Sequence, residues 1–487
     1  MTTSQTAVFR RIVGDHMAPP PVVVPPGTGA AVVVRRMAEA AGSAAVVLDA
    51  ERRVRGIVTE QDVVRRYAAK GSTDLPVDEL MSTPVLTVRV DDQLYEAIGF
   101  MRRHRLRHMP VIDDRGALVG MLHLHDALAV ATGPLVEDID RLTHEESLAG
   151  LAEIKAAQVQ LAERLLADQV PAPEIQALLS DINNDIHRRV LRLSAAAMAA
   201  EGWGEPPAPF ACIVMGSGGR GESLLFPDQD HGFVLADYPD ERHGTVDPWF
   251  IELAERLTAA LDRLRFPICR GGVMATNPLW RKTLPQWRRQ VAGWMRRRTP
   301  ATLLACDIFL DFRCVHGCRA LADELRAFVT EAAARDRGFL QEMFGIQADH
   351  GAGIGLFGRL RTERADRRHR GELNLKLHGT LPLAEAVRLL ALASAVPASG
   401  TLARIDALVE RGVMGADDAD HLRAAFALLT GLQLRRQVAD YRDGRAVSSF
   451  VDPRALSERE LGLLKDALRA VNELRARVRA DLTGALL

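Results

Sequence analysis

One short stretch of the sequence combines glycines, a serine and two aspartates at a spacing that suits phosphate chemistry. An apolar run over 210–215 leads into a Gly-Ser turn at 216–217, and an Asp-Gln-Asp triplet at 228–230 precedes a second apolar run over 231–236. A glycine turn lets backbone approach a phosphate closely, and a serine hydroxyl can donate to a phosphate oxygen. Carboxylates at i and i+2 of a strand point the same way, and two of them can share Mg²⁺. The stretch therefore predicts a phosphate cradle beside a metal site.

Other interpretations of this stretch fit less well. Gly216, Gly218 and Gly221 match the letters of a dinucleotide-binding fingerprint, but the Asp triplet falls where the long helix of that fold would run. No Gly-Lys-Ser/Thr follows the glycines, so the stretch is not a P-loop, and the EF-hand spacing is absent. An ordinary hairpin loop remains the structural alternative.

An internal repeat precedes this stretch, within residues 8–132. Each copy has an apolar strand, an acidic turn, a glycine, a second apolar strand, and then an aspartate that opens a helix. Asp62 in the first copy matches Asp126 in the second, and helices are expected over 32–41 and 94–103. The repeat predicts two β-α-β-β-α units of about 60 residues each.

The repeat resembles a pair of CBS domains. The resemblance implies an adenosine nucleotide (AMP, ADP or ATP) beside Thr59 and Asp62, and beside His123 and Asp126 in the second copy, where His123 replaces the hydroxyl residue. A helix N-terminus offers free N–H groups to phosphate, which suits this position. The alternative is that Thr59 and Asp62 only cap a helix. The resemblance also implies a homodimer formed through the CBS pair.

The Gly-Ser turn with its Asp triplet resembles the polymerase-β-like nucleotidyltransferases. Its motif, G-S-x-x-R-x-E followed by D-Q-D, is similar to that of the bacterial PII-uridylyltransferase and glutamine-synthetase-adenylyltransferase group. The similarity is greatest to putative nucleotidyltransferases that carry a CBS pair in front. The resemblance implies transfer of a nucleoside monophosphate from an NTP to a hydroxyl of a protein or small molecule, with Mg²⁺ or Mn²⁺. It implies these residues as metal ligands or nucleotide contacts: Gly216, Ser217, Arg220, Glu222, Asp228 and Asp230.

The same family has a third carboxylate, and Asp311 matches it in a D-x-R context. Phe309 to Arg313 alternate as on a strand, so Asp311 is expected as third metal ligand and general base, with Arg313 beside it to neutralise phosphate or to hold Asp311. Asp307 lies four residues earlier on the same predicted face and stays an alternative. Arg281 and Lys282, in a turn-rich loop that the group shares, are expected to contact the triphosphate, or to lie in a plain surface loop.

The remaining segments have helical periodicity. Residues 134–205 are expected to form a helical linker, in which a polar cluster around 183–187 is interpreted as a solvated face. Residues 206–345 would form the catalytic domain and 346–487 a helical substrate-binding bundle, with a capping box at Ser457. The polar residues of the bundle that match the related domain are Lys376, Arg404, Arg435 and Gln437; intrahelical charge pairing is the alternative for them.

Composition agrees with a multidomain α+β protein. The 487 residues predict about three domains, and 47% hydrophobic residues exclude a disordered chain. The net charge of −1 and 5% aromatic residues make nucleic acid an unlikely partner. Five cysteines form no disulfide framework, and no apolar run is long enough for a membrane span, so reduced thiols in the cytoplasm are expected. A non-catalytic nucleotide sensor that controls a partner enzyme or transporter is the alternative function.

Overall fold

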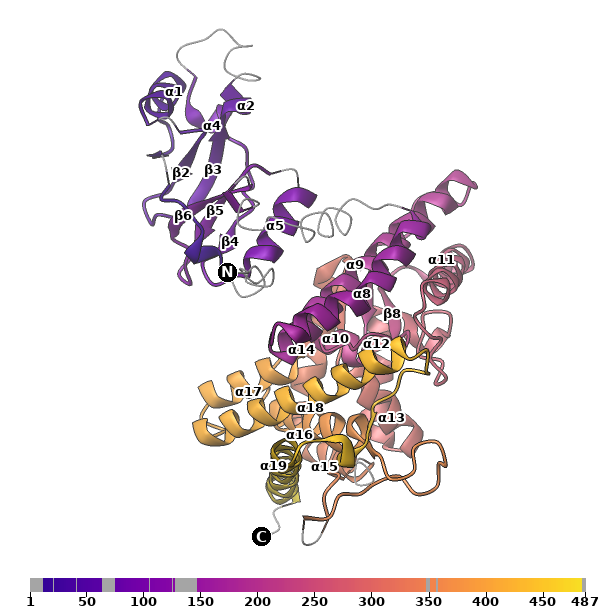
Figure 1. The fold of residues 1–487 in the computed structure, drawn as a ribbon. Helices are drawn as coiled ribbons and strands as arrows, with labels where there is room; N and C mark the ends of the chain where they lie inside the picture. The colour runs from indigo at the N-terminus through magenta and orange to yellow at the C-terminus, as the bar shows by residue number, and fades with distance from the viewer. Residues whose placement is uncertain are drawn as a thin grey trace. The chain divides into compact units, whose positions relative to one another are not determined.

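The computed structural model divides the chain into two compact units, residues 1–145 and 146–487, which are described separately (Figure 1). The structure describes residues 12–20, 22–40, 42–63, 75–104, 106–124, 126–127, 147–346, 351–355 and 358–483.

The first unit contains two small sheets with the same topology. In each sheet the first strand runs parallel to the second, and the second is antiparallel to the third. The first copy comprises β1 (Val23–Val24), α1 (Ala30–Glu39), β2 (Ala44–Leu48), β3 (Val54–Thr59) and α2 (Glu60–Asp62). The second copy comprises β4 (Val88–Arg89), α5 (Leu94–Arg103), β5 (His108–Ile112) and β6 (Leu118–His123); η2 (Val13–Asp15) and α4 (Val77–Leu80) complete the unit.

The two copies also agree in register. The last residue of the first hairpin, Thr59, pairs with Ala44, as His123 pairs with His108 in the second. Both hairpins have a register irregularity near the end of their first strand. The structure therefore confirms the predicted repeat and its helices, since α1 and α5 lie within two residues of the expected bounds.

The second unit begins with two long helices, α8 (Leu148–Ala167) and α9 (Ala172–Ala200), which pack against each other. Pro171 ends the turn between them and provides the N-cap of α9. Asn183 and His187 on α9 are buried, as is Asn184, so the expected solvated face is corrected. Their helix packs against α11 and against the C-terminal α18, and Asp185 of the same cluster is half-buried.

A four-stranded mixed sheet lies at the centre of the unit, in the order β10-β7-β8-β9. The middle strands are antiparallel, β10 is antiparallel to β7, and β9 is parallel to β8. The elements of this part are β7 (Phe210–Val214), α10 (Gly216–Arg220), β8 (His231–Leu235), η4 (Asp240–Arg242), α11 (His243–Arg263), η5 (Pro278–Trp280), β9 (Arg281–Thr283), α12 (Leu284–Arg297), α13 (Pro300–Phe309), β10 (Arg313–Gly317), α14 (Arg319–Arg335) and α15 (Arg337–Ile346).

Two local expectations for this sheet are corrected. The segment 309–312 is the end of helix α13 and the turn after it, and the strand begins only at Arg313. Thr299 caps α13 and Pro300 follows at its first position, which favours a helix here. Residues 281–283 are a strand of the sheet rather than part of a surface loop.

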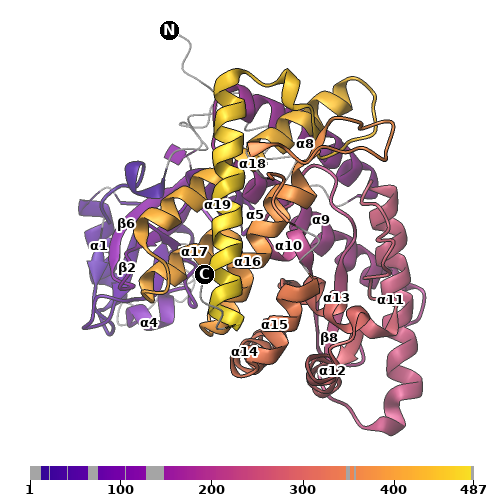
Figure 2. The same cartoon turned by 90° about the horizontal axis from the view of Figure 1, so that it is seen from below.

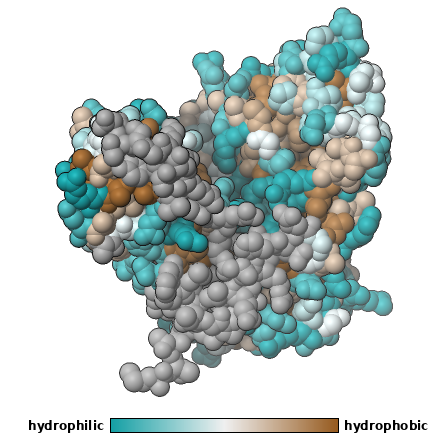
Figure 3. Space-filling model, turned by 90° about the horizontal axis from the view of Figure 1, so that it is seen from above, coloured by the Kyte–Doolittle hydropathy of each residue, from teal (hydrophilic) through white to brown (hydrophobic). Residues whose placement is uncertain are grey.

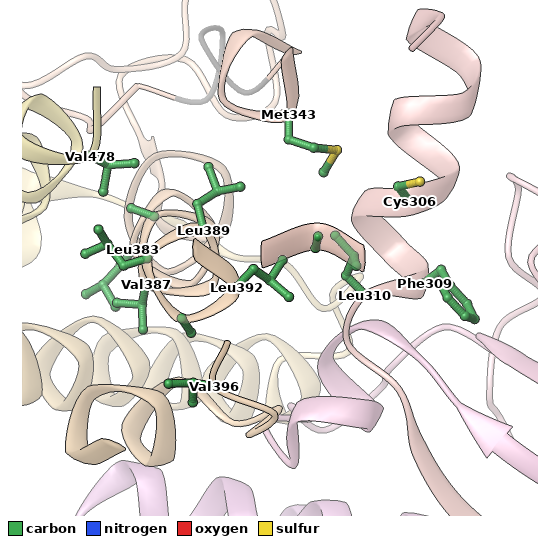
Figure 4. Packing of buried hydrophobic residues seen from close by; sticks show 14 of the residues in the cluster. Cys306, Phe309, Leu310, Met343, Leu383, Val387, Leu389, Leu392, Val396 and Val478 are labelled. Carbon is green, nitrogen blue, oxygen red and sulfur yellow. The ribbon is translucent and has the colours of Figure 1, made fainter. Parts of the chain in front are cut away.

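The C-terminal helices share one hydrophobic core with this sheet. The core runs from Ala211 on β7 to Leu482 on the last helix, and Figure 4 shows Leu310, the residue after α13, between Leu392 of α16 and Phe309 of α13. Figure 2 shows α19 running along α16 and α18. The elements are β11 (Leu373–Asn374), the π-helix η7 (Lys376–Thr380), α16 (Leu381–Ala393), α17 (Thr401–Glu410), α18 (Ala416–Arg442), β12 (Phe450–Val451), η8 (Pro453–Ala455) and α19 (Glu458–Thr483).

Apolar residues on the face drawn in Figure 3 form small patches separated by hydrophilic ones. Among the described residues, no helix is both long enough and apolar enough to cross a membrane.

Candidate active site

The Gly-Ser turn is the first part of the candidate site, at the end of β7. Gly216 has φ +58°, and a Cβ placed on it would lie 3.1 Å from Asp230 Oδ2. The positive φ favours glycine, and a Cβ here would press on the Asp230 side chain. Ser217, the next residue, is half-buried. The turn therefore lies beside Asp230, whose main-chain oxygen also accepts from Met215 N at 2.8 Å.

Asp228 and Asp230 form the second part, on the extended residues just before β8. Gln229 between them is buried and donates to Phe266 O at 2.9 Å, and it bridges to Ile268. Because side chains alternate along extended backbone, the two aspartates lie on the opposite side, Asp228 exposed and Asp230 half-buried.

Electrostatics at this pair favour a positive ligand. The pKa of Asp230 is raised to about 6, first because burial disfavours the charged carboxylate. A hydrogen bond with Cys269 acts in the opposite direction, the negative charge of Asp228 adds to the rise, and the charges of Lys376 and Arg220 lower the pKa. A carboxylate whose ionisation is disfavoured by burial and by a neighbouring negative charge is suited to a divalent cation.

Asp311 lies outside this pair. It is fully buried, and its two oxygens accept hydrogen bonds from three guanidinium groups: Arg220 Nη1 at 2.8 Å, Arg388 Nη1 at 2.8 Å and Arg404 Nη2 at 2.6 Å. These positive charges hold the pKa of Asp311 well below its usual range against the effect of its burial. Asp307 pairs with Arg388 as well. We call Asp311 and its three arginines the arginine clasp.

The clasp joins the sheet to the C-terminal helices. Arg220 is on α10, whereas Arg388 is on α16 and Arg404 on α17. Glu222 adds a second link, since its Oε2 accepts from Arg220 Nε at 2.7 Å and its Oε1 from Thr401 N at 2.6 Å. Arg220 and Glu222, expected as nucleotide contacts, are thus engaged with protein groups.

The other residues predicted to bind phosphate, Arg281, Lys282 and Arg313, have different environments in the structure. Arg281 is buried and donates to Asp247 Oδ1 at 3.0 Å and to Ala275 O at 2.5 Å, so it ties β9 to α11. Lys282 is half-buried, and burial and the charge of Arg281 lower its pKa. Arg313 lies against Gly221, where a Cβ would be 3.0 Å from its Nη2.

The four residues proposed in the C-terminal bundle have different environments. Lys376 is exposed, and its charge acts on Asp230. Arg404 belongs to the arginine clasp, whereas Arg435 pairs with Glu460 at 2.7 Å on the surface. Gln437 is buried, and its Oε1 accepts from Leu225 N at 3.1 Å. Only Lys376 of these four is free to meet a ligand beside the aspartate pair.

The donor set at the aspartate pair fits Mg²⁺ in one particular way. Within the described ranges, no cluster of three or more His, Cys, Asp or Glu side chains could hold a metal ion. The pair therefore supplies two carboxylates, and any further ligands would be water and phosphate oxygens. Mg²⁺ is commonly bound by one or two carboxylates with substrate phosphates and water.

The predicted nucleotide residues of the first unit lie at two strand ends. Thr59 caps α2 in a capping box with Asp62, whose Oδ2 accepts from Thr59 N at 2.9 Å and whose Oδ1 accepts from Ser82 Oγ at 3.2 Å. His123 Nδ1 lies 2.9 Å from His108 Nδ1, and burial lowers the pKa of His108. Asp126 is exposed. The capping role is present at Thr59 and Asp62, and nucleotide binding there remains a prediction.

Sequence reasoning missed two buried charges that organise the site. Arg388 stands in a helix whose other residues, apart from Glu385, are apolar, and a charged residue on such a helix needs a buried partner, which was a readable signal. Lys155 is a lysine in a chain where only five of 62 basic residues are lysine, and it is 2% exposed. Its position on a predicted linker helix concealed it.

Three family models match successive parts of the chain, in the domain order that the sequence predicts. The model described as "Putative nucleotidyltransferase DUF294" matches residues 156–301, and "Putative nucleotidyltransferase substrate binding domain" matches 337–482. The CBS domain model matches 13–69 and 77–133. The transferase match begins within α8, includes the Gly-Ser turn and the Asp triplet, and ends before Asp311.

Similar curated proteins share only short stretches with this chain. An uncharacterized 17.7 kDa protein of Acidianus ambivalens is 36% identical over 81 residues, which is 17% of this chain and 49% of that protein. Homoserine O-acetyltransferase of Methanohalophilus mahii is 40% identical over 76 residues, or 16% of this chain and 15% of that enzyme. The chain thus spans about half, or less, of the curated relatives it matches.

Among solved structures, the CBS domain protein PAE2072 of Pyrobaculum aerophilum, complexed with AMP, is 28% identical and covers 25% of this chain and 100% of its own, with a TM-score of 0.24. CBSX2 in complex with AMP is 26% identical and covers 25% and 95%, with a TM-score of 0.22. The three family matches together cover most of the chain, in the predicted order. The chain therefore belongs to the family described as "Putative nucleotidyltransferase DUF294", with a CBS domain pair in front and the family's substrate-binding domain behind.

Proposed function

We propose that the protein is a metal-dependent nucleotidyltransferase that moves a nucleoside monophosphate from an NTP to a hydroxyl of a protein or small-molecule acceptor. The observation that carries this proposal is the contact between the Gly216 turn and Asp230, with Asp228 on the same side. A phosphate cradle and a carboxylate pair in contact are what transfer at phosphorus requires of a protein. The family match supports the reaction class.

In the proposed reaction the acceptor hydroxyl loses its proton to solvent, its oxygen bonds to the α-phosphorus, the bond from that phosphorus to the bridging oxygen breaks, and pyrophosphate leaves. Asp228 and Asp230 would hold the divalent ion, which neutralises charge on the phosphates when bound. The N–H groups of the Gly216 turn and the Ser217 hydroxyl would orient the triphosphate, and Lys376 would approach it from the C-terminal domain. The positive charge of Lys376 would stabilise the negative charge on the leaving pyrophosphate.

Asp311 takes a structural part in this proposal. Its oxygens would reach a metal only after three guanidinium groups released them, and that leaves buried charges unpaired. We therefore propose that the arginine clasp fixes the C-terminal helices, and with them Lys376, against the sheet. The role of third ligand and base, which the family resemblance implies, is the alternative that the Asp311→Asn measurement below separates.

The test is incubation of the full chain with each labelled NTP, Mg²⁺ or Mn²⁺, and cell extract, followed by mass spectrometry of the labelled product. Asp228→Ala and Asp230→Ala should abolish labelling and pyrophosphate release, whereas the exposed Asp237→Ala should leave both unchanged. Labelling that survives in either site variant contradicts the proposal. The product would also name the donor nucleotide and the acceptor.

Regulation by the CBS pair is part of the proposal. An adenosine nucleotide at Thr59 and Asp62 would bias the transferase, and the unit would pair with a second copy. Calorimetry with AMP, ADP and ATP should show binding that Asp62→Ala weakens and that the exposed Asp114→Ala preserves. Sedimentation of the wild type gives the oligomeric state, and a monomer at all nucleotide concentrations would contradict the dimer.

A non-catalytic nucleotide sensor is the second candidate function. The engagement of Asp311 by three arginines favours it, because only two carboxylates then remain for metal. A sensor would bind NTP with Mg²⁺ in calorimetry, release no pyrophosphate with any acceptor, and recover a stable partner enzyme or transporter in a pull-down.

A further inference from the structure

The segment 222–225 connects the Gly-Ser turn to the Asp triplet and belongs to no helix or strand. Its residues Ser223 and Leu225 are buried, so their backbone N–H and C=O groups need partners inside the protein. Those partners are side chains from helices that are far away in the sequence. We call this segment the connecting segment.

Two helices, α9 and α18, provide three of these hydrogen bonds. Gln176 Nε2 donates to Glu222 O at 3.1 Å, and Ser180 Oγ accepts from Ser223 N at 2.8 Å. Gln437 Oε1 accepts from Leu225 N at 3.1 Å. The connecting segment is thus held by polar side chains in the way that a strand is held by its neighbours.

Lys155 on α8 provides the fourth hydrogen bond, and it is the charged residue among these four partners. Its Nζ donates to Leu225 O at 2.8 Å, to Gln158 Oε1 at 2.8 Å and to Asn183 Oδ1 at 2.9 Å. Gln158 Nε2 also donates to Asn183 Oδ1 at 2.9 Å, so the acceptors are themselves fixed. Nζ lies 4.2 Å from the centre of the Phe266 ring, a cation–π contact. An ammonium that satisfies three acceptors holds Leu225 O from one side.

The chain after Leu225 has little freedom before it reaches the metal pair. Phe226 stacks on Tyr441 of α18 with ring centres 5.9 Å apart, Pro227 has a fixed φ, and Asp228 follows. Leu225 is therefore the last backbone position fixed by hydrogen bonds before the carboxylates. Asp228 thus lies between two fixed points, Leu225 on one side and Gln229 on the other, whose N–H donates to Pro267 O at 2.9 Å.

We propose that Lys155 is a positioning residue, which fixes the Leu225 carbonyl and so sets Asp228 at the correct distance from the Gly216 turn. This inference rests on the proposed function, because it assigns the placement of Asp228 to metal and triphosphate binding. It also gives a role to the helical segment before the sheet, which supplies the scaffold of the connecting segment through α8 and α9.

Hydrogen exchange tests the positioning step without any activity. In Lys155→Met, exchange of peptides that cover 222–230 should accelerate at least tenfold, while β7 over 210–214 keeps its protection. Lys465→Met, at a lysine on α19 that is not among the hydrogen-bond partners given above for the connecting segment, is the matched control and should leave both regions unchanged. Unaltered exchange over 222–230 in Lys155→Met overturns the inference.

Mn²⁺ binding, followed by electron paramagnetic resonance, tests the consequence for the site. Partners that orient metal ligands typically contribute 10–100-fold to affinity, so Lys155→Met should weaken Mn²⁺ binding by about that factor. A merely structural role would lower the melting temperature and leave the Mn²⁺ affinity of the folded protein intact; faster exchange with unchanged Mn²⁺ affinity therefore overturns the inference. Absence of Mn²⁺ binding in the wild type contradicts the proposed function, and the exchange result then still decides whether Lys155 holds the segment.

Ser180→Ala keeps the inference testable if Lys155→Met does not fold. The substitution removes one hydroxyl and leaves Ser223 N–H without its acceptor, a smaller perturbation of the same segment. Exchange at Ser223 should accelerate, and Mn²⁺ affinity should fall in the same direction as predicted for Lys155→Met. Wild-type values of both quantities in Ser180→Ala would overturn the scaffold role.

Discussion

Asp311 is the residue at which a structural role and a metal-binding role make different predictions, and Asp311→Asn separates them. The substitution keeps the shape of the side chain and removes its negative charge. Both carboxylate oxygens lie within 2.8 Å of guanidinium nitrogens from buried arginines. A structural clasp must lose free energy of unfolding when the charge is removed, whereas a plain metal ligand leaves the metal-free protein at wild-type stability.

The expected loss of unfolding free energy in Asp311→Asn depends on which ion pairs each arginine keeps. Two of the three arginines keep a second carboxylate, but among the ion pairs of the described residues Arg404 is joined to no carboxylate other than Asp311. Arg404 is 1% exposed, so the variant leaves its charge buried and unpaired. Breaking such a pair costs about 3–5 kcal/mol. Given an unfolding entropy of about 2.1 cal/mol/K per residue over the roughly 340 residues of the unit, the melting temperature should fall by about 4–7 °C.

Calorimetry in the presence of a chelator measures this loss without any contribution from metal. Asp228→Asn is the matched control, because the exposed Asp228 should change the free energy of unfolding by no more than about 0.5 kcal/mol. A double-mutant cycle with Arg404→Gln then isolates the pair. We expect a coupling energy of about 1–3 kcal/mol, since the two side chains are in direct contact.

One result would refute the clasp. If Asp311→Asn melts at the wild-type temperature in chelator and at the same time binds Mn²⁺ more weakly, Asp311 is a metal ligand, and its arginine contacts do not stabilise the fold. Loss of stability with wild-type Mn²⁺ affinity supports the clasp. Measuring activity alone would not distinguish the two roles, because an unfolded variant is inactive for either reason.

Other substitutions test single contacts. Gly216→Ala should weaken Mn²⁺ binding and cost about 1–2 kcal/mol of unfolding free energy, because its φ is +58° and its Cβ would lie 3.1 Å from Asp230 Oδ2 and displace that ligand; Gly218→Ala, whose Cβ would meet only ordinary contacts at 3.7 Å or more, is the control. Ser457→Ala should cost about 1 kcal/mol, measured in urea, through loss of the capping box of α19.

The parts that the sequence could predict depend on neighbours in the chain. The repeat of the first unit, the strands on either side of the Gly-Ser turn and the capping box at Ser457 each follow from residues a few positions apart. The contact of Gly216 with Asp230 is also nearly local, because β7 and β8 are paired neighbours joined by a short connection. Periodicity, turn residues and spacing are sufficient for such features.

The strand expected around Asp311 shows where local reasoning failed. Alternation of apolar and polar residues over 309–313 is compatible with a strand, but Thr299 and Pro300 begin a helix that buries Phe309 and continues to that residue. A short alternating run cannot be told from the last turn of a buried helix by its pattern. The partners of Asp311 are 77 to 93 positions away in the chain, and no spacing rule reaches that far.

The choice between lysine and arginine is the point at which composition and structure meet. In a chain whose basic residues are nearly all arginine, Lys155 is surrounded by three acceptors at 2.8–2.9 Å that converge on one nitrogen. A compact ammonium with three donors matches that arrangement, whereas a planar guanidinium would spread its donors apart. At Asp311 the geometry is reversed, since two carboxylate oxygens serve three guanidinium groups that arrive from different helices. Because lysine is scarce in this chain, its presence was a signal of a site that needs a compact charge. Lys155 is the clearest such case among the described lysines, and it lies at the backbone that leads to Asp228.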